Sequence, residues 1–382
     1  MALSFRPNRS DAEAREEVAA KRFDVQPYTG PYEEARNLSS RLAEHLEHLV
    51  ALQAMEQLEP GVLLLDGTLA TRHIASAFNF SRHGWFAIEY ALAYAEMLRA
   101  ARERGWHVLA IAKSSRAAPM RDLALREMFN SLVGRLASLG PDRIAELRAA
   151  WDLAVRNPSY GVKLALDAAR DAPDLSAELT ALAHLFYEKH LRHSDVDVIR
   201  RHVRGVGRTP AMLVGPYTDP ARKQVNKLRG EVMDVASEVS SGERARRLLG
   251  GMSEEELVDR AREAIAATLN LPTPVTVYVR LREDDDPLKL EFPCWELGVD
   301  LPWQMAPPEQ LTDQARERVE WLVGVARAGY AGPRFHNVWL ERVDRRVKLR
   351  AGVVEALYER YLWRELGELI PHARGERRVL GI

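Results

Sequence analysis

The chain has 382 residues and a formal net charge of −1, and 46% of its residues are hydrophobic. This composition is typical of a globular protein with a sizeable core, and any binding of nucleic acid would depend on a local basic patch. The one cysteine, Cys294, excludes an internal disulfide and argues against a zinc site built from cysteines. No apolar stretch reaches membrane-spanning length and no signal-peptide core follows Met1, so we expect a cytoplasmic protein without membrane contact.

An arm, a helix and a central strand are predicted for the N-terminal part of the chain. Residues 1–32 are polar and weakly periodic, as in an arm outside the core. Between residues 33 and 57 the apolar residues recur at helical spacing. The apolar run at 62–65 lies between two glycines, which is typical of a buried central strand with Asp66 as its exit residue.

Asp66 stands where α/β proteins place their chemistry, because the end of a buried strand is rigid and yet open to water and ions. The alternative is that the Asp66–Gly67 pair only forms a turn or caps the next helix. A phosphatase of the haloacid dehalogenase type is excluded, because its nucleophilic aspartate would stand at the position of Leu64.

Two glutamates of the preceding helix, Glu44 and Glu47, lie three residues apart and close to one face. Either can point at Asp66, and a divalent cation needs two or more carboxylates converging on one point. The alternative is that both are solvated, as most helix glutamates are.

Lys113 follows a second predicted strand, at 106–112, after a helix at 85–104. A strand, a helix and a strand form a parallel crossover, so Asp66 and Lys113 should emerge at the same edge of the sheet. A lysine there can bind a phosphate or offset charge on a leaving oxygen. The alternative is a merely exposed lysine.

Residues 119–270 read mainly as amphipathic helices, which predicts a helical insertion. Within them, residues 189–230 carry ten lysines and arginines against three aspartates, a net charge of +7. Clustered cations of this kind can follow a DNA backbone, although a solvated helix face is the alternative. The candidate DNA-binding residues are Arg200, Arg201, Arg204, Arg208, Arg222, Lys223 and Lys227.

The C-terminal part begins with a predicted hairpin, with strands at 274–281 and 288–292. We expect the aspartates of its turn to be solvated. Helices are predicted at 310–328 and 352–370. Between them, His336 and Asp344 flank an apolar segment, and both side chains suit a metal ion or a general base.

Four stretches, in this order and spacing, resemble the NurA nucleases. The first is Leu-Leu-Leu-Asp-Gly-Thr-Leu, the second an apolar strand ending in Lys-Ser-Ser, the third a hairpin ending in Leu-Glu-Phe-Pro, and the fourth the segment with His336 and Asp344. They occupy residues 63–69, 108–115, 277–293 and 335–349.

The resemblance implies an α/β fold with an RNase H-like mixed sheet core, formed by 33–118 and 271–382, around the helical subdomain inserted at 119–270. It further implies an exonuclease and endonuclease that acts on DNA ends with Mn²⁺ or Mg²⁺. The implied partners are a second copy of the chain, as a homodimer, and a hexameric ATPase of the HerA type that acts in end resection and double-strand break repair.

The resemblance also implies roles for five residues. Asp66 matches a metal ligand, Glu47 or else Glu44 matches the helix glutamate, and Lys113 matches the strand-end lysine. Asp344 takes the C-terminal His/Asp position, and His336 stands where the family has tyrosine.

One family motif, an earlier strand ending in Asp-Gly-Ser, has no counterpart before residue 33. Because metal-assisted hydrolysis needs several converging ligands, another carboxylate such as Asp24 or Glu89 would have to replace its aspartate. The alternative function is a catalytically weak or inactive subunit that binds DNA and docks on the translocase.

Overall fold

The computed structural model describes residues 2–3, 16–17, 32–78, 85–113, 118–135, 141–171, 173–203, 205–216, 219–230, 253–283, 285–306, 309–311, 316–333 and 336–347. Of the helix predicted at about 223–249, only the part up to residue 230 is described, and the helix predicted at 352–370 lies outside the described residues. In the described part, no helix combines the length and the apolar character needed to cross a bilayer.

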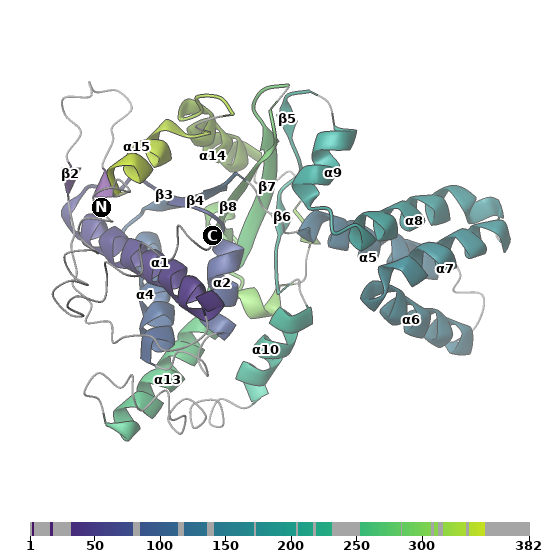
Figure 1. Cartoon of the computed structure of the whole chain (residues 1–382), viewed down its shortest axis with the longest axis horizontal. Helices are drawn as coiled ribbons and strands as arrows, with labels where there is room; N and C mark the ends of the chain where they lie inside the picture. The colour runs from purple at the N-terminus through teal and green to yellow at the C-terminus, as the bar shows by residue number, and fades with distance from the viewer. Residues whose placement is uncertain are drawn as a thin grey trace, which may run out of the picture.

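A mixed sheet forms the centre of the molecule (Figure 1). Its strands β3 and β4 are parallel, as the crossover predicts, and the remaining neighbours pair antiparallel, so the predicted α/β class is confirmed. The order across the sheet is β3 (Val62–Asp66), β4 (His107–Ala112), β8 (Leu288–Pro293), β7 (Pro274–Arg280), β6 (Met212–Leu213) and β9 (Glu309–Gln310), and β5 (Gly207–Arg208) also pairs with β7. A separate two-stranded sheet joins β1 (Ala2–Leu3) to β2 (Glu16–Glu17).

The register of the strands shows which strand ends lie together at one edge of the sheet, called the functional edge below. Asp66 lies opposite Ile111 on β4, and Ala112 lies opposite Lys289 at the start of β8. The end of β3, the end of β4 and the turn between β7 and β8 therefore share one edge of the sheet, because β8 runs antiparallel to β4.

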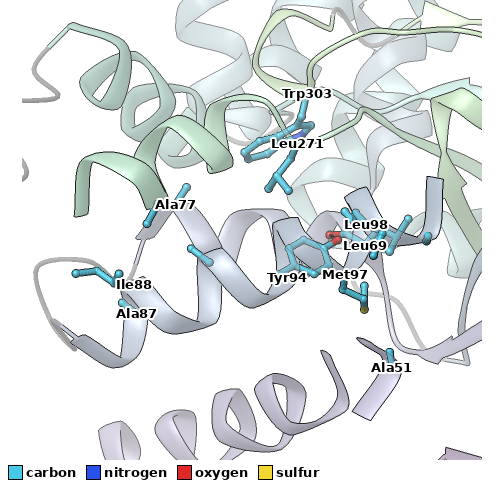
Figure 2. Close-up of a cluster of buried hydrophobic side chains, with 14 of the residues drawn as sticks. Ala51, Leu69, Ala77, Ala87, Ile88, Tyr94, Met97, Leu98, Leu271 and Trp303 are labelled. Carbon is cyan, nitrogen blue, oxygen red and sulfur yellow. Dashed lines mark hydrogen bonds between the residues drawn. The ribbon is translucent and has the colours of Figure 1, made fainter. Parts of the chain in front are cut away.

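Helices cover the first face of the sheet. Leu63 and Leu65 of β3 point into this layer, where α4 packs between α1 and α13. Figure 2 shows part of this cluster, with Tyr94 and Leu98 of α4 near Leu69 at the start of α2. The helices of the layer are α1 (Tyr32–Gln57), α2 (Leu69–Phe78), α4 (Trp85–Glu103), α10 (Asp219–Gly230) and α13 (Glu254–Leu269).

The opposite face packs against α14 (Arg316–Ala328), and α15 (Val338–Val347) contacts β3. Leu64 of β3 belongs to this second cluster, as the alternation of a strand requires. The helix predicted from Gln310 begins only at Arg316, because Glu309 and Gln310 pair with β6 as β9. Two short 3-10 helices, Cys294–Leu297 and Trp303–Met305, connect β8 to β9.

A group of helices extends from one side of the sheet (Figure 1) and has its own apolar core. It contains α5 (Pro119–Arg135), α6 (Pro141–Arg156), α7 (Pro158–Asp171), the 3-10 helix Pro173–Leu175 and α8 (Ser176–His190), and α9 (Asp195–His202) follows it. The stretch predicted as helical, 119–270, is not helical throughout, because β5 and β6 return the chain to the sheet.

The buried carboxylate of Asp195 connects these helices to the sheet. It accepts hydrogen bonds from the main-chain N–H groups of Met120 (2.7 Å) and Arg121 (3.0 Å) and from the Tyr278 hydroxyl (2.8 Å). Burial raises the pKa of Asp195 to about 6, more than these hydrogen bonds lower it. The N-terminus of α5 is thus held against β7.

Candidate functional site

Asp66 ends β3 with an exposed side chain at the functional edge. Gly67 follows with a φ of +100°, a conformation that favours glycine, and the chain turns directly into α2. Within the described residues the Asp66 carboxylate has no hydrogen bond or ion pair. It is therefore open to bind water or a cation.

Arg72 of α2 connects Glu47 to the end of β3. Its guanidinium donates to Glu47 Oε2 (2.6 Å), to the main-chain oxygen of Asp66 (3.0 Å) and to His48 Nε2 (2.8 Å). The Arg72 side chain is only 3% exposed, whereas that of Glu47 is 48% exposed. Partial desolvation raises the pKa of Glu47, more than Arg72 lowers it, and the charges of Glu44 and Asp66 raise it further. Glu44 and Asp66 thus both lie within electrostatic reach of Glu47.

Glu44, the alternative helix glutamate, has partners of its own. Its Oε2 accepts hydrogen bonds from Arg41 Nη1 (2.5 Å) and from the Tyr90 hydroxyl (2.7 Å). Both helix glutamates that the sequence offers are therefore engaged by the protein itself.

His336 lies in the connection between α14 and α15 with a φ of +44°, which is uncommon for a residue other than glycine. Its Nδ1 is buried and has no hydrogen-bond partner in the described part of the chain. Burial lowers the pKa of His336, and the charge of Lys113 lowers it further, against the opposing effects of Asp285, Asp286 and Asp66. The imidazole is therefore neutral at pH 7, next to Lys113 and Asp66, and it can accept a proton or bind a cation.

Asp285 is a site residue that the sequence analysis did not identify. We predicted that the hairpin aspartates are solvated, and for Asp285 this is wrong: it is 8% exposed and accepts a hydrogen bond from the Tyr330 hydroxyl. The sheet topology could have identified Asp285. If β8 pairs antiparallel with β4, the β7–β8 turn has to lie at the same edge as Asp66.

A buried ion pair lies behind this edge, on β8. Lys289 Nζ and Glu291 Oε1 are 2.5 Å apart, and their side chains are 0% and 1% exposed. Glu291 also accepts hydrogen bonds from the Ala70 main-chain N–H (2.9 Å) and the Thr276 hydroxyl (3.1 Å). Glu291 thus holds the first turn of α2, four residues after Asp66.

The remaining predicted ligands and stand-ins are spread over several elements. Asp344 lies half-buried on α15, the helix that contacts β3. Glu89 forms an ion pair with Arg260 of α13, at 2.5 Å, within the helix layer. Asp24 lies outside the described residues.

Ion pairs neutralise part of the predicted basic stretch. Arg200 lies 3.2 Å from Asp197 and 3.5 Å from Asp286, so α9 reaches the β7–β8 turn. Arg201 pairs with Glu188, and Arg208 pairs with Glu320. Lys223 is exposed and Lys227 half-buried on α10, whereas Arg204 and the side chain of Arg222 lie outside the described residues.

The His336 segment depends on Gly329, after the end of α14. A Cβ on Gly329 would lie 2.8 Å from the Trp339 ring and against Asn337 Nδ2. Asn337 is buried, and its Oδ1 accepts the main-chain N–H groups of Trp339 and Leu340 at 3.1 Å, which caps α15.

We therefore expect Gly329→Ala to destabilise the protein by about 1–3 kcal/mol, because the added methyl overpacks this contact. It should also slow any cleavage that depends on His336. Gly324→Ala is the matched control, since its Cβ meets open space on α14 and should stabilise the helix by about 1 kcal/mol. Urea unfolding of both variants measures the effect, and equal stabilities would contradict this view of Gly329.

Among the described residues of the functional edge, only those near the end of β3 offer free donor atoms for a cation. Asp66 offers a free carboxylate, the kind of donor that Mn²⁺ and Mg²⁺ prefer, and His336 adds an unpartnered ring nitrogen. The Glu47 carboxylate is already held by Arg72. Across the described ranges, no three His, Cys, Asp or Glu side chains converge to hold a metal ion.

Comparison with known proteins finds one family. The model of the NurA domain matches residues 7–349, which is most of the 382-residue chain. Neither the curated proteins nor the solved structures give a match. The finer assignment of the sheet as an RNase H-like core stays a prediction. Because this match covers most of the chain, the chain belongs to the NurA domain family, a family of nucleases.

Proposed function

We propose that the protein is a metal-dependent DNA nuclease that processes DNA ends as a homodimer, together with a HerA-type hexameric ATPase, in double-strand break repair or related DNA processing. The observation that carries the proposal is the exposed carboxylate of Asp66, which has no ion pair within the described residues, near the neutral His336 and Lys113 in a chain of a nuclease family. The cytoplasm is the proposed location.

In this proposal each residue has a distinct role. Asp66 and His336 would hold the cation at the sheet edge, whereas Asp344 of α15 does not join them in a three-ligand group among the described residues. Lys113 binds the scissile phosphate and offsets the negative charge that grows on the leaving oxygen. A bound Mn²⁺ or Mg²⁺ would lower the pKa of a coordinated water and stabilise the transition state. The neutral imidazole of His336 can instead accept the proton of that water.

The proposed DNA path crosses α9. The Arg200–Asp286 pair places this helix beside the β7–β8 turn, whose Asp285 lies near His336. A strand whose phosphates contact the basic residues of α9 and α10 would therefore lead to the functional edge. Such binding weakens steeply with salt, because phosphate contacts release counterions.

Cleavage of end-labelled single-stranded and double-stranded DNA tests the proposal. We expect product formation with Mn²⁺, less or none with EDTA, and faster cleavage when the HerA-type ATPase and ATP are added. Cleavage that continues unchanged in EDTA would contradict the metal dependence. An unchanged rate with the ATPase would contradict the partnership.

A second candidate is a DNA-binding and assembly subunit with little or no catalytic activity. It is favoured by the lack of three converging ligands in the described part of the chain and by the pairing of Glu47 with Arg72. Salt-sensitive DNA binding without Mn²⁺-dependent cleavage, in the same assays, would identify this function.

A further inference from the structure

Arg72 touches both Glu47 and the end of β3. It comes from the end of the first turn of α2, and its three contacts, to Glu47, to the main-chain oxygen of Asp66 and to His48, are all between 2.6 and 3.0 Å. These contacts bring together α1, α2 and β3. The guanidinium is thus fixed in the region where the sequence predicts that Glu47 and Asp66 share a cation.

This guanidinium is a permanent positive charge. Burial lowers the pKa of Arg72, but the carboxylates of Glu47 and Glu44 raise it by more, so the side chain stays protonated. A buried guanidinium needs its carboxylate partner, because an unpaired charge in the protein interior is costly. Glu47 is the only carboxylate in direct contact with Arg72 among the described residues.

The neighbouring acids do not offer a replacement ligand. Glu44 is already held by Arg41 and the Tyr90 hydroxyl, at 2.5 and 2.7 Å. A divalent cation bound to Glu47 would also lie close to the Arg72 charge and be repelled by it. Asp66 is different, because Arg72 contacts only its main-chain oxygen and leaves its carboxylate free.

We propose that the Arg72 guanidinium occupies the place of a cation between Glu47 and the end of β3, so that Glu47 is a positioning residue and not a metal ligand in this chain. Glu47 then acts through Arg72, which fixes the main chain at Asp66. The effect of Glu47 on cleavage rests on the proposed function. The contacts between Glu47, Arg72 and Asp66 are independent of that function. It departs from the role that family resemblance assigns to Glu47.

The test measures Mn²⁺ binding by isothermal titration calorimetry on the full chain, independently of cleavage. Glu47→Gln should leave the affinity for Mn²⁺ within about twofold, because the amide keeps an oxygen for Arg72. Loss of a metal ligand should cost at least the roughly 10–100-fold that loss of an outer-shell partner typically costs. Arg72→Met should tighten Mn²⁺ binding by about tenfold or more, because it frees the Glu47 carboxylate and removes the repelling charge. The double variant Glu47→Gln/Arg72→Met should lose this gain.

Tenfold weaker Mn²⁺ binding by Glu47→Gln, or Mn²⁺ binding by folded Arg72→Met no tighter than wild type, would overturn the proposal. If Arg72→Met does not fold, Glu47→Gln decides alone, because its side chain is half exposed and the substitution keeps an oxygen for Arg72. Glu56→Gln is the matched control on the same helix, because Glu56 is exposed and lies 3.9 Å from Arg104, and it should bind Mn²⁺ like wild type. If the wild-type protein binds no Mn²⁺, then Glu47 does not bind this cation, as the proposal states. The same result would contradict the proposed metal-dependent function, which is a separate claim.

Kinetics give a second readout. In Glu47→Gln, we expect a lower kcat at an unchanged Mn²⁺ requirement, as for a group that positions Asp66. A raised Mn²⁺ requirement that is rescued by excess Mn²⁺ would instead show that Glu47 is a ligand. Loss of cleavage in Asp66→Ala tests the proposed function and leaves this comparison unaffected.

Discussion

Asp66→Ala is expected to lower the rate of DNA cleavage by roughly a thousandfold, because a cation or water held at this carboxylate contributes several kcal/mol to the transition state and each tenfold in rate is about 1.4 kcal/mol. The folded state should hardly change. The Asp66 side chain is exposed and makes no hydrogen bond within the described residues, and its contact to Arg72 uses the main-chain oxygen, which alanine keeps. Single-turnover cleavage of labelled DNA in Mn²⁺ measures the loss.

Asp259→Ala is the matched control, because Asp259 is an exposed aspartate of α13 that forms an ion pair with Arg262. It should cleave at the wild-type rate. Both variants should unfold in urea within about 0.5 kcal/mol of wild type, as surface substitutions do. Alanine is preferred to asparagine, since an Asn–Gly pair can deamidate back to aspartate. Cleavage by Asp66→Ala within tenfold of wild type would refute the central role of this carboxylate.

Glu291→Gln is expected to reduce the free energy of unfolding by about 3–5 kcal/mol, because it leaves the Lys289 ammonium buried without its charge partner. The amide oxygen can still accept one of the hydrogen bonds from Ala70 and Thr276. The loss is therefore one of charge pairing rather than of packing. Because Ala70 lies in the first turn of α2, loosening this contact should also displace the Asp66–Thr68 connection and slow cleavage.

The double variant Lys289→Met/Glu291→Gln separates the two effects, since it removes both charges. We expect it to recover most of the lost stability, as buried ion pairs replaced by neutral residues of similar volume often do. Glu103→Gln is the exposed counterpart, because its partner Arg99 is 57% exposed and such surface pairs contribute at most about 1 kcal/mol. Urea unfolding compares the four proteins. A Glu291→Gln variant as stable as Glu103→Gln would contradict the prediction.

The sequence could predict the elements that local patterns and chain topology control. The apolar run at 62–65 formed β3, because a short Val/Leu run between glycines has few other stable conformations. The parallel pairing with β4 followed from the helix between the two strands, since such crossovers are almost always right-handed. The position of Lys113 directly after β4, at the edge where β3 ends, is a consequence of that pairing.

Side-chain partners were beyond the sequence. Helical spacing placed Glu47 near Asp66, but it could not show that Arg72, 25 residues later, would hold its carboxylate. Likewise, nothing local distinguishes Asp285 from its neighbours in the turn, and its burial depends on Tyr330, 45 residues away. The basic stretch was identified from its charge alone, whereas its pairing with Glu188, Asp286 and Glu320 depends on how α9 and β5 meet other elements.

The amino-acid sequence by itself thus determined the α/β class, the strand that ends in Asp66 and the family, because periodicity, turn residues and motif order are properties of neighbouring residues. Only the tertiary structure decided which acids at the edge are free and which are already paired. Hydrogen bonds and ion pairs act over a few ångströms, so they depend on which distant segments the packed core brings into contact.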